Sequence, residues 1–156
     1  MNPSRRKALK TGGGVTLLGA LFAAGFLKSG DAIAVEWNKA AFESKAVADA
    51  LKSLGAANPA ESKDIIITAP DIAENGAVVP IAVTSKIPNT QSISIIAEKN
   101  PFPLTSTFDV ANGGEGYVSI RLKIGQTSNV RAIVKADGRF YTAAKEVKIT
   151  IGGCGG

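Results

Sequence analysis

The stretch Tyr117-Val-Ser-Ile-Arg-Leu-Lys-Ile124 alternates apolar and polar side chains without a break. Its even-numbered residues are Val, Ile, Leu and Ile, and its odd-numbered residues are Tyr, Ser, Arg and Lys. Successive side chains of a β-strand point to opposite faces, so this pattern predicts a strand with one face in a core and the other in water. The stretch therefore indicates a β fold.

The same period of two recurs on both sides of this stretch. Residues 130–135 and 146–151 repeat it, and Asp137-Gly138 predicts a tight hairpin into residues 139–141. Further candidate strands, separated by Asn, Gly and Pro, lie at 64–69, 78–85, 92–98 and 103–110. The spacing predicts a mainly β fold, an immunoglobulin-like antiparallel β-sandwich of about seven strands. The Cys…Trp…Cys pattern of antibody domains is absent, and a small β-barrel is the alternative.

One amphipathic helix is predicted before the strands. From Asn38 to Leu54 the apolar residues fall at helical spacing and charged residues occupy the other side. Asn38 is a plausible N-cap and Gly55 a plausible stop. We expect this helix to pack against its own sheet, and binding to a partner is the alternative.

The composition excludes several kinds of chemistry. The chain of 156 residues contains no histidine, and Cys154 is its single cysteine. A Cys–His or Ser–His dyad therefore lacks its base, and Cys/His zinc sites and blue-copper sites lack their ligands. An internal disulfide is also excluded. Chemistry must be carboxylate-based, supplied by a bound cofactor or partner, or centred on one thiol, and we expect no metal.

The net charge of +5 comes mostly from one end of the chain. Residues 1–34 hold five basic groups and one acidic group, which leaves 13 basic and 12 acidic groups in the remainder. The body of the protein is thus nearly neutral, with its charges interspersed. This pattern does not favour a nucleic-acid partner.

Residues 1–34 have the pattern of a secretory signal peptide. A basic segment with Arg5-Arg6 precedes an apolar stretch at 12–27 and a small-residue site, Ala32-Ile-Ala34. The paired arginines predict the twin-arginine route, although Ala8 stands where that motif usually has Phe. We expect cleavage after Ala34, a periplasmic location and no membrane attachment after cleavage. An ordinary secretory signal and an uncleaved anchor are the alternatives.

The chain ends Gly152-Gly-Cys-Gly-Gly156, directly after the last predicted strand. Glycine has no side chain and the widest backbone freedom, so Gly152, Gly153, Gly155 and Gly156 predict a thin, flexible arm that carries Cys154. Residues 35–151 would then be the folded domain and 152–156 the arm. A frayed tail with an incidental cysteine, or a handle for an intermolecular disulfide, is the alternative.

Several stretches of the sequence resemble the SoxY family of sulfur-oxidation proteins. The terminal Gly-Gly-Cys-Gly-Gly is similar to the carrier arm of that family and is the most specific of these stretches. The others are Ala69-Pro-Asp-Ile-Ala-Glu-Asn-Gly-Ala-Val-Val-Pro80, Glu98-Lys-Asn-Pro101, Val134-Lys-Ala-Asp-Gly138 and Lys145-Glu-Val-Lys-Ile-Thr-Ile151.

The resemblance implies a carrier subunit in periplasmic thiosulfate oxidation, which is itself not an enzyme and has no cofactor. Cys154 would be the covalent attachment point for the substrate. The implied partners are a SoxZ-like β-sandwich subunit forming a heterodimer, a c-type-haem enzyme that joins thiosulfate to the thiol, and a hydrolase that releases sulfate. Export of a folded heterodimer would account for the twin-arginine signal.

Other functions stay open on the residues alone. A structural or adhesion-type periplasmic β-sandwich would explain the strands and the signal but not the tail. A thiol-redox protein would need a second cysteine to resolve a mixed disulfide. Asp71 and Glu74, in the segment before Val78, are candidates for a docking face or for an ordinary solvated turn.

Overall fold

The computed structural model describes residues 37–111 and 113–151. Within this part of the chain, two short helices precede nine strands. The helices are α3 (Lys39–Glu43) and α4 (Val47–Ser53). The strands are β1 (Ala60–Glu61), β2 (Ile65–Thr68), β3 (Ile72–Asn75), β4 (Val79–Ser85), β5 (Thr90–Ala97), β6 (Leu104–Asp109), β7 (Tyr117–Leu122), β8 (Ser128–Ala136) and β9 (Arg139–Ile151).

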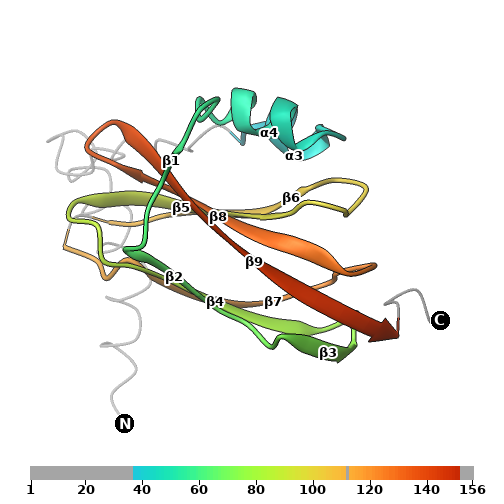
Figure 1. Cartoon of the computed structure of the whole chain (residues 1–156). Coiled ribbons are helices and arrows are strands. Elements are labelled where there is room, and N and C mark those ends of the chain that lie inside the picture. The colour runs from blue at the N-terminus through green and yellow to red at the C-terminus, as the bar shows by residue number, and fades with distance from the viewer. Residues whose placement is uncertain (1–36, 112, 152–156) are drawn as a thin grey trace, which may run out of the picture. The chain divides into compact units, whose positions relative to one another are not determined.

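The strands of the described residues form two facing sheets (Figure 1). The larger has the order β1-β9-β8-β5-β6, and β3 also pairs with β9. The smaller is antiparallel, with the order β2-β4-β7. The predicted mainly β sandwich with helical structure at its N-terminal end is therefore confirmed. No described helix has the length and apolar character needed to cross a membrane.

The alternating pattern of the sequence accounts for the main core. In β7, Val118 and Ile120 are half-buried and Leu122 is buried, whereas the residues between them are exposed. The facing strands contribute the same kind of alternating side chains, so the two inner faces enclose an apolar layer. Its fully buried members include Val79, Ile81, Val83, Ile93, Ile95, Val130, Val134 and Val147.

A second, smaller core lies under the helices, on the outer face of the larger sheet. Ala41 of α3 and Ala50 of α4 are fully buried there, against Ile96 and Ile133 of the sheet. Figure 1 shows the helices covering only part of that face. The expectation that the helical segment packs on its own sheet is confirmed.

The prediction of a single helix is wrong in one respect, because the helical segment is interrupted after Glu43. Ser44 has extended backbone, and its hydroxyl donates to the carbonyl of Ala40 at 2.7 Å. Serine side chains compete in this way for backbone groups and weaken a helix interior. Both predicted ends are observed. Asn38 Oδ1 accepts from Ala41 N at 3.1 Å, and Gly55 follows α4 with φ +76°.

The strand count also differs from the prediction, and the differences concern β9. The two predicted strands after the hairpin are one strand of 13 residues. Strands β1 and β3 were not predicted, and both pair with β9 in parallel rather than antiparallel fashion. Both strands are short, and both pair with β9, which is distant from them in the sequence. Neither has a run of alternating apolar and polar side chains long enough to predict a strand. Figure 1 shows β9 running diagonally across the sandwich to β3.

Candidate functional site

The predicted arm is attached to the end of β9. Cys154, Gly152, Gly153, Gly155 and Gly156 lie outside the described residues, as do Arg5, Arg6 and the predicted cleavage site at Ala34. The described part of the site is therefore the place where the arm begins. There Asn75 of β3 is paired with Ile151, the last residue of β9. Cys154 lies three positions after Ile151 in the sequence.

Hydrogen bonds join the loops around this point into one end of the sandwich. Ile124 N donates to the Gly76 carbonyl at 2.7 Å. The Asn100 side chain donates to the Lys123 carbonyl at 2.8 Å and accepts from Gly125 N at 3.2 Å. Residues 76–78, 99–102, 123–127 and 148–151 are called the arm-root end below. Figure 1 shows these segments at the end of the sandwich where β9 terminates.

β9 is itself fixed at the arm-root end. Ile149 N donates to the hydroxyl of Thr127 at 3.0 Å, and Lys148 N donates to the carbonyl of Asp71 at 2.9 Å. These bonds replace the pairing with β8, which stops at Val147. The last strand residues before the arm thus keep partners on the body of the protein.

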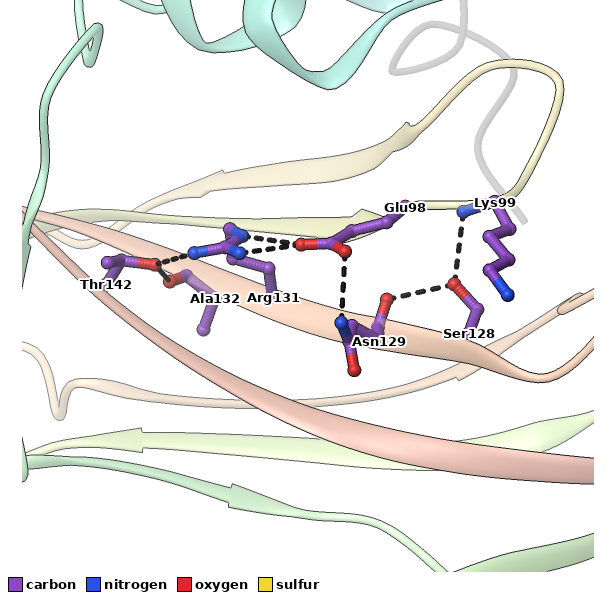
Figure 2. A network of polar contacts seen from close by, with 7 residues as sticks. All are labelled: Glu98, Lys99, Ser128, Asn129, Arg131, Ala132 and Thr142. Carbon is purple, nitrogen blue, oxygen red and sulfur yellow. Dashed lines mark hydrogen bonds and ion pairs between the residues drawn. The ribbon is translucent and has the colours of Figure 1, made fainter.

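A polar network behind the arm-root end holds the start of the 99–102 loop (Figure 2). Glu98 Oε1 accepts from Arg131 Nε at 2.8 Å and Nη2 at 2.7 Å, and its Oε2 accepts from Asn129 at 3.2 Å. The hydroxyl of Ser128 accepts from Lys99 N at 3.1 Å. Paired charges with this many hydrogen bonds orient a segment firmly. Sequence reasoning missed this network, because Glu98 and Arg131 are 33 positions apart.

This network is better suited to holding the 99–102 loop in place than to catalysing a reaction. Arg131 lines a cavity of about 490 Å³ that is also lined by Ser62 and Thr142. Glu98 already compensates its charge, and the two hydroxyls have backbone partners. Ser62 Oγ accepts from Asp64 N, and Thr142 Oγ1 donates to the Ala132 carbonyl. The chain has no histidine that could activate either hydroxyl.

Asp71 and Glu74 lie beside β9 rather than in an isolated turn. Asp71 forms an ion pair of 3.0 Å with Lys145, whose ammonium group also donates to the Ala69 carbonyl at 2.6 Å. Glu74 belongs to β3, and its carbonyl lies 3.5 Å from the hydroxyl of Thr150. Glu74 therefore belongs to a strand that pairs with the end of β9, and Asp71 directly precedes that strand. Within residues 37–111 and 113–151, no cluster of acidic side chains suited to a metal ion is present.

The family model for the sulfur oxidation protein SoxY matches residues 50–154. That match covers most of the chain and ends at Cys154. The chain belongs to the SoxY family. The resemblance inferred from the tail and the upstream stretches is thereby confirmed.

A solved SoxY structure supports the same assignment. It is described as the sulfur carrier protein SoxY from Chlorobium limicola f thiosulfatophilum, and it is 40% identical to this chain. The match covers 66% of this chain and 94% of that one, with a TM-score of 0.58. A structure concerning toxic shock syndrome toxin-1 matches 55% of this chain and 98% of the other at 9% identity, with a TM-score of 0.39. No curated protein sequence matches significantly.

Proposed function

We propose that this SoxY-family chain is a covalent carrier that holds sulfur intermediates of thiosulfate oxidation on the thiol of Cys154. The observation that carries the proposal is the family match, which runs to Cys154, and a solved relative described as a sulfur carrier protein supports it. The protein is then a substrate for other enzymes and not a catalyst. The glycines on both sides of Cys154 leave the thiol with very little steric bulk.

The first step of the cycle would join thiosulfate to the carrier. The Cys154 thiol loses its proton, a bond forms between its sulfur and the sulfane sulfur of thiosulfate, and two electrons pass to a partner enzyme that contains c-type haem. In the next step water attacks the terminal sulfonate, so the sulfur–sulfur bond to that group breaks. Sulfate leaves, and a persulfide remains on Cys154.

The described domain fits a passive carrier. The polar groups of the Glu98 network and the hydroxyls of its cavity are engaged in structural hydrogen bonds. No basic residue stands next to Cys154 in the sequence, where glycines flank it on both sides. Activation would therefore come from the partner's pocket. An unactivated thiol is also less prone to oxidation between encounters.

Substitution of the thiol tests the proposal. The Cys154→Ser variant should fold as the wild type does, because Cys154 lies beyond the last strand. Thiosulfate-dependent electron transfer in a reconstituted mixture of Sox enzymes should fall to background. Mass spectrometry of the wild-type tail should show sulfur-bearing adducts on Cys154. Full turnover by the serine variant would overturn the carrier function in favour of a structural β-sandwich with an incidental cysteine.

The partners and the export route complete the proposal. A SoxZ-like subunit would form a heterodimer with residues 35–151, and the pair would reach the periplasm through the twin-arginine signal of the SoxY chain. Cleavage after Ala34 would then release it from the signal. Replacing Arg5 and Arg6 by lysine should leave the precursor in the cytoplasm. Undiminished export of that variant would contradict this route.

A further inference from the structure

We infer that β7 is an interaction edge at which two copies of this chain pair, antiparallel to each other and centred on Ser119. The smaller sheets of the two copies, with three strands each, would then join into one sheet of six strands. The inference goes beyond the carrier function, which requires no second copy. It is carried by a pattern of side chains along β7 that is complementary to itself.

The outer edge of β7 is regular and open. In the part of the chain that the structure describes, β7 pairs with β4 on one side and with no strand on the other (Figure 1). Its pairing with β4 runs without a register shift from Tyr117 to Leu122. The edge strand of the larger sheet, β6, differs, because a register shift interrupts its pairing with β5. An uninterrupted edge is the kind that can accept another strand.

The backbone groups of alternate β7 residues are directed at this open edge. The Gly116 carbonyl accepts from Ser85 N at 2.7 Å and is therefore directed toward β4. Pro80 has no N–H group, so its pairing with Arg121 fits the pair type without hydrogen bonds. Since successive residues of a strand alternate in direction, the N–H and carbonyl groups of Ser119 and Arg121 are directed away from β4 and toward the open edge.

The exposed side chains of β7 complement a second copy in antiparallel orientation. When Ser119 of one copy faces Ser119 of the other, Tyr117 of each copy faces Arg121 of the other, as the two-fold symmetry of a dimer requires. Tyr117 is 52% exposed, and Arg121 is exposed on the same face of the strand. An aromatic ring and a guanidinium group in opposite positions attract each other.

The residues around this centre extend the complementarity. In the same register Glu115 of one copy approaches Lys123 of the other, and both side chains are exposed in the single chain. On the inner face Val118 comes opposite Ile120 of the second copy, and both are only half-buried in the single chain. The pairing would thus bring opposite charges together and cover apolar surface. Because the contact is only one strand wide, we expect the association to be weak and dependent on concentration.

Charge reversal tests the pairing, with the dimer Kd measured by sedimentation velocity on full chains that all carry Cys154→Ser, so that no disulfide through Cys154 contributes. Lys123→Glu would place like charges opposite each other twice in each symmetric dimer, and it should raise the dimer Kd at least about tenfold. The charge swap Glu115→Lys/Lys123→Glu should restore the Kd to within about threefold of the parent value. Lys52→Glu, at an exposed position of α4, makes the same change in net charge and should leave the Kd unchanged.

Cross-linking tests the register. The two Ser119 Cα atoms of the dimer would be about 5.5 Å apart, a separation that suits a disulfide. In the same Cys154→Ser background, Ser119→Cys should therefore form a covalent dimer on mild oxidation with diamide. Thr68→Cys is the matched control, because Thr68 is also exposed and also paired with Ala82, but lies on β2 at the other edge of the sheet. It should cross-link much more slowly.

Three results would overturn the pairing at β7. They are a chain that stays monomeric at every concentration, a dimer whose Kd is unchanged by Lys123→Glu, and equal rates of cross-linking for Ser119→Cys and Thr68→Cys. If Lys123→Glu unfolds in thermal melts, the comparison of the two cysteine variants decides.

Discussion

At the scale of single residues, Glu98 and Arg131 show how an ion pair supports one loop of the arm-root end. Their side chains are 22% and 27% exposed, so each charge has lost much of its water and depends on the other. Asn129 and Ser128 extend the contact to the backbone of the 99–102 loop. The pair thus connects the middle of β8 with the arm-root end.

We predict that Glu98→Gln lowers the free energy of unfolding by about 1–2 kcal/mol, because the Arg131 guanidinium then lacks its counter-charge. Glu43→Gln is the matched control, since it breaks the pair of Lys39 and Glu43, whose side chains are 67% and 60% exposed. Loss of such an exposed pair should cost less than about 0.5 kcal/mol. Urea unfolding followed by circular dichroism gives both values. Equal costs for the two variants would contradict the supporting role of Glu98.

At the scale of elements, the sequence predicts the pieces that follow a local rule. The alternation in Tyr117–Leu122 indicates both the strand and its inward face, and Asn38 and Gly55 mark the ends of the helical segment. The centre of β9 does not follow this rule. Its Thr142-Ala-Ala sequence has little hydrophobic contrast, although Thr142 is buried and paired with Ile133. The interruption at Ser44 depends on one side-chain hydrogen bond, which periodicity does not predict.

The end of α4 gives a prediction at this scale. Gly55 N donates to the Lys52 carbonyl and Ala56 N to the Leu51 carbonyl, which is the hydrogen-bond pattern of a Schellman motif. With φ at +76°, Gly55→Ala should lower the free energy of unfolding by about 1 kcal/mol through backbone strain. The new Cβ would lie 3.8 Å from the ring of Phe140, so crowding adds little.

Gly125→Ala is the matched control for that variant. A Cβ at Gly125 would meet nothing within 4 Å, and its φ lies outside the left-handed region. We expect this alanine to be neutral or to stabilise the protein by up to about 1 kcal/mol, because it restricts the unfolded chain. Thermal melts of both variants decide. A Gly55→Ala variant as stable as Gly125→Ala would mean that the helix end tolerates a left-handed alanine without cost.

At the scale of the whole molecule, the sequence predicts the parts but not how they are brought together. Alternation and turn residues indicate a sandwich, and the glycines around Cys154 indicate an arm. The pairing of Asn75 with Ile151 joins segments 76 positions apart, and no local pattern marks it. That pairing puts the exposed Ile72 and Val78 next to the origin of the arm. The neighbours of the arm's origin therefore became apparent only from the structure.

The thinness predicted for the arm is the feature that would distinguish a carrier from an ordinary reactive cysteine. If the thiol must enter a partner's pocket, a branched or aromatic neighbour should clash with the pocket wall and stiffen the backbone. Gly153→Val and Gly155→Phe should therefore slow loading of Cys154 by the haem enzyme at least about tenfold, a barrier change of about 1.4 kcal/mol. Alkylation by iodoacetamide and the unfolding transition should stay nearly unchanged. Because bulk at these positions impedes entry, the loss should persist at saturating carrier. Equal normalised loading rates for the glycine variants and the wild type would show that the thiol reacts outside any narrow pocket.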